Sequence, residues 1–300
     1  MACLSQLNEA APPGLQFVGG AGGLVFGEIE TELCTGRFAL HGGHVCGFQP
    51  RGAKPLLFMS NEAVFQEGKA IRGGIPVCFP WFGSKKDEQN ELVAGAPAHG
   101  LVRTKTWELA TATASDTGVT IGMQTIEDGW RISNRITFGR SLICDFTVEN
   151  RGSESRECEI ALHTYFQIGD VTRVLIDGLG TLPYLDQLTG ESHKPENSPS
   201  HAPIRFTEET DRIYHGVASE ISLSDEASKR EILVKSRGSQ STVVWNPWIA
   251  KSKRMADFGD DEYKEMCCIE TANIRPNQLV IQPNASANIW LEIEQSNQSC

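Results

Sequence analysis

Apolar and polar residues alternate with a period of two through much of the chain between residues 107 and 148. The alternation recurs in three successive stretches, at residues 119–123, 132–138 and 142–148. A period of two is typical of a β-strand that buries one face and exposes the other. We therefore predict a series of neighbouring antiparallel strands in this part of the chain.

The remaining pattern also favours strands. Asp128-Gly129 lies where a hairpin turn is expected, and a sustained helical repeat is missing apart from a short stretch at residues 260–267. The pattern thus predicts an all-β protein with few short helices. Residues 1–23 are rich in glycine, proline and alanine, and we expect them to form a loose N-terminal segment. Because no linker divides the chain, we expect residues 1–300 to form a single domain.

The first candidate for chemistry lies on the strand expected over residues 157–168. Even-numbered positions of this strand are mostly apolar, so His163, Tyr165 and Gln167 belong to the opposite, polar face. His163 is then either an ordinary surface histidine or a side chain in a cleft that binds a sugar.

The second candidate is Glu270, in the stretch MCCIETANI. If this stretch is a strand, Met266, Cys268 and Ala272 share the face of Glu270, which places a carboxyl group among apolar neighbours. Burial of this kind raises the pKa of a carboxyl group towards neutrality, as a general base at pH 7 requires. The alternative is a buried structural glutamate that pairs with an arginine.

Residues 71–103 form an irregular stretch that reads IRGGIPVCFPWFG, then a charged turn, then AHGLVR. Paired glycines and two prolines predict a rigid loop, which would present Arg72 and Trp81 to a ligand. We expect Trp81 to contact the substrate. Arg72 and Arg103 could each bind a phosphate or carboxylate through a planar guanidinium group. Alternatively, either arginine pairs with a structural carboxylate.

Charge and cysteine usage narrow the class of protein. The net charge of −11 argues against a general nucleic-acid binder and against attraction to anionic membranes, so an anionic ligand needs a local basic pocket. Nine cysteines without regular spacing indicate a reducing compartment rather than a disulfide framework. The sequence shows neither a signal-peptide pattern nor a membrane span, so we expect a cytoplasmic protein.

Cofactor motifs are also missing, because the chain has no GxGxxG, P-loop or GxSxG sequence. His41 and His44 form an HxxH pair. Without a helix or a suitably spaced carboxylate, such a pair is weak evidence for a metal site. We therefore expect no cofactor and no metal. The histidines and carboxylates of the chain can still catalyse acid–base reactions, which need no cofactor. Interconversion of the anomers of an aldose needs only a base for the O1 hydroxyl proton and an acid for the ring oxygen.

Several motifs together resemble those of one enzyme family. IRGGIPVCFPWFG, HGLVR, ALHTYFQIGD, YLDQLTG, DRIYHG, VVWNPW and CCIETANI are similar to motifs of the hexose-6-phosphate mutarotases, also called glucose-6-phosphate 1-epimerases, a branch of the aldose 1-epimerase superfamily. The resemblance covers residues 42–273. It implies a large antiparallel β-sandwich of the galactose mutarotase type and a hexose 6-phosphate as the substrate.

The resemblance also implies roles for individual residues. Glu270 corresponds to the family base and His163 to the family acid. His99 and Asp211 correspond to sugar-binding residues, although composition alone allows Asp211 to be a turn aspartate. Arg72, together with Arg103, corresponds to the phosphate ligand of this branch.

Three other interpretations stay open. A carbohydrate-binding β-sandwich without turnover would not need both His163 and Glu270. An aldose 1-epimerase that acts on unphosphorylated sugars is disfavoured by the two arginines, Arg72 and Arg103. A cupin-like metal enzyme would be detected by metal analysis. We expect a monomer.

Overall fold

Two eight-stranded antiparallel sheets dominate the computed structural model, which describes residues 3–87, 89, 91–194 and 203–296. The first sheet has the strand order β13-β17-β18-β22-β9-β8-β7-β6. Its strands are β6 (Glu108–Ser115), β7 (Gly118–Glu127), β8 (Trp130–Phe138), β9 (Leu142–Asn150), β13 (Val174–Asp177), β17 (Glu220–Asp225), β18 (Arg230–Arg237) and β22 (Ser286–Ser296).

The second sheet has the order β15-β14-β16-β19-β20-β11-β5, and β12 also pairs with β20. Its strands are β5 (Val77–Cys78), β11 (Ile160–Leu162), β12 (Tyr165–Gln167), β14 (Tyr184–Asp186), β15 (Ser192–His193), β16 (Thr210–His215), β19 (Ser241–Asn246) and β20 (Met266–Asn273). Strand β20 is buried along its whole length, because β19 flanks it on one side and β11 and β12 on the other.

Smaller elements complete the fold. A four-stranded sheet contains β1 (Leu15–Gly19), β2 (Val25–Glu30), β3 (Cys34–Ala39) and β4 (His44–Pro50), and a two-stranded one contains β10 (Arg156–Cys158) and β21 (Leu279–Ile281). The helices are short: α1 (Leu4–Glu9), α2 (Trp248–Ser252) and the 3₁₀ turns η1 (Ala21–Gly23), η2 (Val102–Thr104), η3 (Val171–Arg173) and η4 (Glu262–Glu265). Within the described ranges, no helix is long and apolar enough to cross a membrane.

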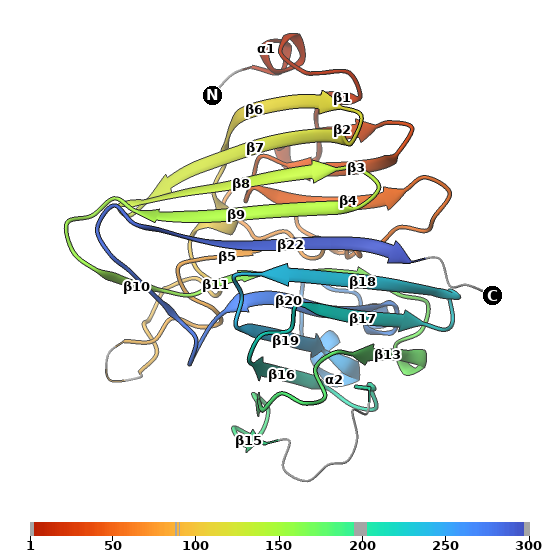
Figure 1. The fold of residues 1–300 in the computed structure, drawn as a ribbon, viewed down its shortest axis with the longest axis vertical. Helices are drawn as coiled ribbons and strands as arrows, with labels where there is room; N and C mark the ends of the chain where they lie inside the picture. The colour runs from red at the N-terminus through yellow and green to blue at the C-terminus, as the bar shows by residue number, and fades with distance from the viewer. Residues whose placement is uncertain (1–2, 88, 90, 195–202, 297–300) are drawn as a thin grey trace.

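The first sheet packs face to face against the four-stranded sheet, as expected for a sandwich. Figure 1 shows the first sheet running from β6 at the top to β17 and β13 in the lower half, with β1–β4 overlapping its upper part. Phe138 of β8 contacts Phe38 of β3 and Phe48 of β4, with ring centroids 6.1 and 6.4 Å apart. Such contacts remove apolar surface from water and stabilise the sandwich. The prediction of an all-β antiparallel sandwich is confirmed.

The period-two stretches form strands of the first sheet. Every second residue of β8 and β9 is buried, which is the alternation read from the sequence. The turn at Asp128 and Gly129 joins β7 to β8, and both residues have positive φ, of 46° and 73°. Two residues with positive φ match the twist of the paired strands. The hairpin predicted at this dipeptide is confirmed.

The N-terminal segment differs from the expectation of a loose chain. Helix α1 precedes β1, which pairs with β2, and Phe17 of β1 is buried. The side-chain amide of Asn8 donates to the carbonyl oxygen of Phe17 and its amide oxygen accepts from the Phe17 N–H. The strand was not predicted because the glycines of this segment interrupt the alternation of apolar and polar residues. A contiguous apolar core includes both Leu7 and Ile293, and the single domain stays a prediction.

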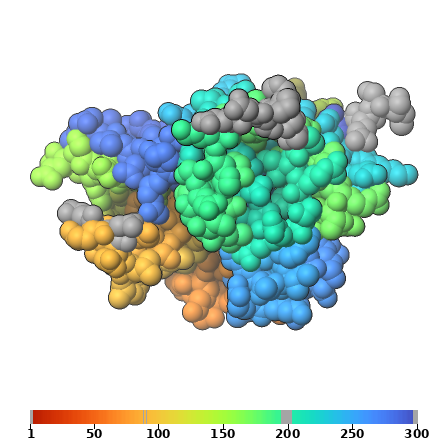
Figure 2. Space-filling view, turned by 90° about the horizontal axis from the view of Figure 1, so that it is seen from below, coloured from red at the N-terminus to blue at the C-terminus, as the bar shows by residue number. Residues whose placement is uncertain are grey.

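Segments far apart in the sequence meet at one end of the molecule. Figure 2 shows this end, where an orange and yellow region from the first third of the chain borders green and blue regions from later in the chain. The cavity described next draws its lining from all of these regions.

Candidate active site

A cavity of about 420 Å³ lies where the loop after β5, the helix α2 and strands β16, β19 and β20 come together. It brings together five residues that the sequence analysis singled out, namely Arg72, His99, His163, Asp211 and Glu270. The other lining residues are Phe82, Gly83, Ser84, Gln187, Trp245, Lys251 and Met255.

His163, in the break between β11 and β12, lies opposite Glu270 of β20. Leu162 pairs with Thr271 and Tyr165 pairs with Cys268, and this register places His163 across from Glu270. The distance from His163 Nδ1 to Glu270 Oε1 is 3.3 Å. Only 6% of His163 and 1% of Glu270 is exposed, so the pair is largely shielded from water.

The predicted strand over residues 157–168 is divided into three short strands. The chain changes partners along this stretch: β10 pairs with β21, β11 pairs with β20 and β5, and β12 pairs with β20. His163 lies in the break between β11 and β12 and is buried rather than on an open polar face. Tyr165 stacks on it, with ring centroids 4.7 Å apart and planes at 9°.

Burial changes the proton affinity of both groups. The pKa of Glu270 is raised well above its usual range, chiefly by burial and then by the nearby Asp211 carboxylate. The pKa of His163 is lowered well below its usual range by burial, then by the nearby His99 ring and by the positive charge of Arg72. A proton on the imidazole is therefore easily lost, and a proton is readily taken up by the carboxylate.

His99 is fixed in the cavity wall by its own loop. Its backbone has a positive φ of 61°, which is uncommon for a residue with a side chain. The N–H of Gly83 donates to His99 Nδ1 over 3.3 Å, and the His99 N–H donates to the Gly83 carbonyl over 2.7 Å. Because Nδ1 accepts and burial lowers the pKa of His99, the ring is neutral and carries its proton on Nε2. That N–H can donate to a bound hydroxyl group.

Glu159 stabilises this loop through hydrogen bonds. One of its carboxylate oxygens accepts the Phe82 N–H over 2.8 Å, and the other accepts from the backbone and side chain of Arg275. Phe82 in turn contacts the His99 ring edge to face, with centroids 4.7 Å apart. The carboxylate thus keeps the loop with His99 against the sheet.

Asp211 lies on β16, two strands away from Glu270. The Gln187 amide donates to its Oδ1, and Lys251 Nζ lies 3.6 Å from Oδ2. Burial raises the pKa of Asp211, while Lys251 opposes the shift. The Lys251 ammonium also lies 5.6 Å above the centre of the Trp245 ring. Carboxylate, amide and ammonium groups therefore converge on one side of the cavity.

Arg72 enters the cavity with a partner. Its Nε and Nη2 donate to the two carboxylate oxygens of Asp257 over 3.2 Å each, and Nη1 donates to the Tyr165 hydroxyl over 3.0 Å. This arrangement fixes the plane of the guanidinium group and links it to the ring stacked on His163. Two of the five N–H bonds on Arg72 remain for another acceptor.

Arg103 and Trp81 lie outside the lining of this cavity. Arg103 donates from Nη2 to the Ala98 carbonyl over 2.8 Å, on the same loop as His99. Trp81 donates from its indole to the Pro97 carbonyl over 3.0 Å, and Lys85 Nζ lies 4.7 Å above its ring. Trp81 lines a separate cavity, together with Lys85 and Arg156.

Gln187, Lys251 and Met255 were not expected from the sequence. Gln187 follows β14, and Lys251 lies in α2. A pattern of apolar and polar positions does not report which loop approaches which strand, so these residues carried no usable signal. Asp257, which holds Arg72, lies 185 positions away from it and was missed for the same reason.

The histidines considered as metal ligands are both buried. His41 Nε2 forms a hydrogen bond with the Lys69 carbonyl over 2.6 Å. His44 is buried, and its pKa is lowered to about 3, mainly by burial. Among the described residues, these two histidines do not belong to a cluster of three groups that could hold a metal ion. His163, Cys268 and Glu270 do form such a cluster.

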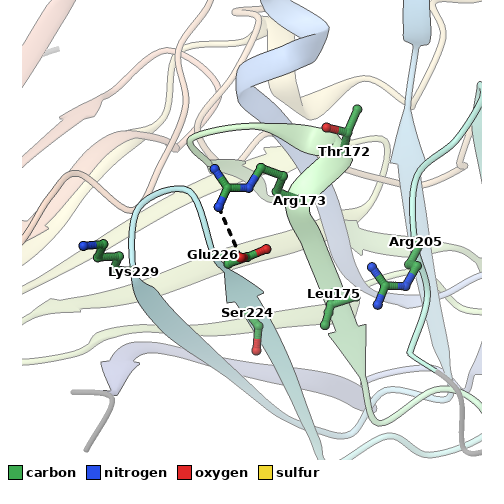
Figure 3. Close-up of a pocket in the computed structure, with 7 residues that line it drawn as sticks. All are labelled: Thr172, Arg173, Leu175, Arg205, Ser224, Glu226 and Lys229. Atoms are coloured by element: carbon green, nitrogen blue, oxygen red, sulfur yellow. Dashed lines mark ion pairs between the residues drawn. The ribbon is translucent and has the colours of Figure 1, made fainter. Parts of the chain in front are cut away.

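Another cavity lies beside β13, β17 and the turn between β17 and β18 (Figure 3). Its lining includes three basic side chains, Arg173, Arg205 and Lys229, and the Arg173 guanidinium pairs with Glu226 over 3.2 Å. None of the residues assigned to chemistry lines this cavity.

Comparisons with known proteins show which proteins this chain is similar to. The family model described as Aldose 1-epimerase matches residues 28–294. A protein of Escherichia coli K12 named "Putative glucose-6-phosphate 1-epimerase" is 33% identical over 261 residues, which cover 84% of this chain and 84% of that protein. A protein of the same name from Cenchrus ciliaris is 32% identical over 259 residues, covering 80% of this chain and 75% of the other.

A solved structure has the same fold. The crystal structure of a protein from Salmonella typhimurium, described as "a putative mutarotase", superposes with a TM-score of 0.84 at 26% sequence identity. The superposition covers 95% of this chain and 94% of that one.

Proposed function

The chain belongs to the aldose 1-epimerase family, and we propose that it is an isomerase that interconverts the α and β anomers of glucose 6-phosphate and related hexose 6-phosphates. The names of its relatives support the phosphorylated substrate. The observation that carries the proposal is the His163–Glu270 pair, 3.3 Å apart and buried beside a cavity.

The reaction needs two proton transfers in each direction. Glu270 takes the proton from the O1 hydroxyl while His163 gives a proton to the ring oxygen, and the bond between C1 and the ring oxygen breaks. The product is the open-chain aldehyde, in which the C1–C2 bond can rotate. Closure on the other face of the carbonyl returns a proton to O1 and restores the proton on His163.

The environment of the pair supports these roles. A carboxylate with a raised pKa is a stronger base than a free glutamate, and an imidazolium with a lowered pKa is a stronger acid than a free histidine. The same shifts favour protonated Glu270 and neutral His163, so the reactive charged pair is the less populated form. Each positioned group of this kind contributes on the order of 10²–10⁴ in rate. Neither transfer requires a cofactor.

Hydroxyl groups of the sugar would be oriented by the cavity wall. His99 offers an N–H from Nε2, and Asp211 with Gln187 offers an acceptor and a donor. Trp245 presents an aromatic ring beside them. Trp81 remains a candidate substrate contact only if the ligand extends beyond this cavity.

The phosphate group would bind to cations of the loop and of α2. Arg72 is held rigidly by Asp257 and retains free N–H bonds, and Lys251 is a second cation in the lining. The charge of Arg103 lowers the pKa of His99, and only burial has a larger effect on that pKa. In a protein of net charge −11, such local positive charge favours an anionic substrate over an unphosphorylated sugar.

The test is α/β exchange of glucose 6-phosphate, followed by NMR exchange spectroscopy in the presence of a chelator. Wild-type protein should accelerate exchange, and Glu270→Gln and His163→Ala should each reduce the rate by about 10²–10⁴. Glu67→Gln, which changes an exposed carboxylate remote from the cavity, is the control and should behave as wild type. Equal exchange by wild type and Glu270→Gln would instead support a carbohydrate-binding protein without turnover.

We also propose that the protein acts as a monomer in the cytoplasm. All eight cysteines in the described part of the chain are free thiols, which suits a reducing compartment. Light scattering after size-exclusion chromatography would give the mass, and a value near twice 32.9 kDa would overturn the monomer.

A further inference from the structure

Three potential metal ligands converge beside the cavity. Cys268 and Glu270 are two positions apart on β20 and so extend from the same face of the sheet. His163 lies opposite Glu270, in the break between β11 and β12. One ligand atom from each residue, a ring nitrogen, a thiol sulfur and a carboxylate oxygen, lies within 4.8 Å of the other two.

Two polar atoms of this cluster make no hydrogen bond, although one of them, His163 Nδ1, lies 3.3 Å from Glu270 Oε1. His163 Nδ1 and Glu270 Oε2 are buried and make no hydrogen bond with any described residue. Buried polar atoms are nearly always paired, because an unpaired one costs about 1–3 kcal/mol. The sugar would satisfy these atoms during the reaction, and so would a bound cation.

We propose that His163, Cys268 and Glu270 form an inhibitory Zn²⁺ site. The inference rests on the proposed function of His163 and Glu270, and it adds Cys268 as a third ligand. One imidazole nitrogen, one thiolate sulfur and one carboxylate oxygen are donors that Zn²⁺ accepts in tetrahedral sites. The fourth position would face the cavity and hold water.

Charge balance is compatible with a divalent cation here. Cys268 binds as a thiolate and releases its proton to solvent, and Glu270 binds as a carboxylate, so that two negative charges meet the two positive charges of Zn²⁺. Two basic side chains of the cavity lining already have acidic partners: Arg72 pairs with Asp257. Lys251 pairs with Glu209 over 3.3 Å. Their repulsion of the metal is therefore reduced.

Occupation of this site would stop catalysis. Zn²⁺ would engage the lone pair with which Glu270 accepts the O1 proton and the ring nitrogen with which His163 handles its proton. Metal and sugar would also compete for the same space, so inhibition should weaken as the concentration of glucose 6-phosphate rises. A chelator should restore the rate, because no covalent bond of the protein changes.

Metal binding can be measured without any assay of activity. Co²⁺ replaces Zn²⁺ in such sites, and a thiolate ligand adds a charge-transfer band in the near ultraviolet. Wild-type protein titrated with Co²⁺ should show this band, whereas Cys268→Ser should not. Cys267→Ser is the matched control, since Cys267 is the adjacent buried cysteine on the opposite face of β20, and it should keep the band.

Inhibition is then measured as the loss of sugar-phosphate exchange with added ZnCl₂. The concentration of Zn²⁺ that halves the rate should rise by about 10- to 100-fold in Cys268→Ser, while its metal-free rate stays near that of wild type. Cys267→Ser should remain as sensitive as wild type, and MgCl₂ should inhibit none of these proteins, because Mg²⁺ avoids thiolate ligands.

The outcomes separate the two proposals. Absence of the thiolate band in wild type, or equal Zn²⁺ sensitivity of wild type and Cys268→Ser, would overturn the metal site. Absence of exchange by metal-free wild type would overturn the proposed function instead. Cys268→Ala provides a second variant if Cys268→Ser does not fold, which circular dichroism would reveal.

Discussion

At the scale of single residues, the site depends on groups that hold other groups. Arg72 shows this most directly, because Asp257 and Tyr165 occupy three of its N–H bonds and set its plane. A guanidinium fixed in this way loses little side-chain entropy when it binds an anion. The acidic partner therefore serves to orient the cation as well as to balance its charge.

Arg72→Ala should chiefly weaken the binding of phosphorylated sugars. A charge-assisted hydrogen bond contributes about 1.5–3 kcal/mol, so KM for glucose 6-phosphate should rise by roughly 10- to 100-fold with a smaller change in kcat. Exchange rates measured across a range of substrate concentrations would separate the two constants.

Asp257→Asn is the companion variant. It retains the Arg72 cation and an oxygen acceptor, so its KM should lie between those of wild type and Arg72→Ala. Equal losses for glucose and glucose 6-phosphate in Arg72→Ala would argue against a phosphate ligand at this position.

His44 should make stability depend on pH. Burial lowers its pKa from 6.5 to about 3, and the nearby His41 and Arg103 act in the same direction. Below pH 6.5 the unfolded chain binds a proton that the folded chain does not, so the stabilisation present above this pH is lost as the pH falls towards 3. The free energy of unfolding should fall by up to about 1.4 kcal/mol per pH unit in this window.

Urea unfolding at pH 7, 6 and 5 would measure this slope. His44→Gln should flatten it, because glutamine does not titrate, while His193→Gln, outside the core, should leave it unchanged. An unchanged slope in His44→Gln would show that other groups cause the acid sensitivity.

At the scale of elements, one close contact fixes the position of His99. Gly100 follows His99 and has a φ of +81°, and a Cβ atom on it would lie 1.9 Å from the Phe79 carbonyl oxygen. Only glycine permits this approach of the two backbones. The loop that carries His99 is therefore attached to the strand region that precedes Pro80.

Gly100→Ala should consequently reduce both stability and activity. We expect a loss of about 3 kcal/mol in the free energy of unfolding and a marked rise in KM, because His99 must move. Gly95→Ala is the matched control: its φ is +77°, but no atom lies within 4 Å of the added Cβ. That variant should lose only about 1 kcal/mol, from the positive φ alone. Thermal unfolding and exchange rates would provide both comparisons, and similar losses in the two variants would contradict a role for the contact.

The elements also show what sequence patterns can predict. Residues 266–273 form one strand, so alternation correctly placed Cys268 and Glu270 on one face. Residues 157–168 form three strands with different partners, and alternation predicted neither the break at His163 nor its burial. Periodicity reports the face of a strand, whereas the partners of that strand depend on distant parts of the chain.

At the scale of the whole molecule, the cavity joins residues from Arg72 to Glu270. The resemblance in sequence indicated five of these twelve residues individually, but the pairing of Arg72 with Asp257 and the approach of Lys251 arise only when the sheets and loops assemble. Ligand binding therefore requires most of the fold to be intact.

Substrate should stabilise the chain as one unit. At a concentration about 100 times Kd, glucose 6-phosphate should raise the free energy of unfolding by about 2.7 kcal/mol. In each condition, tryptophan fluorescence and circular dichroism should give one common unfolding midpoint. That common midpoint should be higher with the ligand than without it. Two separate transitions, of which only one shifts, would contradict the prediction of a single domain.

The register of the second sheet has a further consequence. Tyr165, Cys268, Trp245, Asp211 and Gln187 succeed one another across neighbouring strands. Adjacent strands are about 4.8 Å apart, a step comparable to the width of a six-membered sugar ring. Each strand can therefore present a different functional group at a spacing that matches the sugar ring. A single substitution at one of these positions would change which sugar epimer binds, while the sheet stays the same.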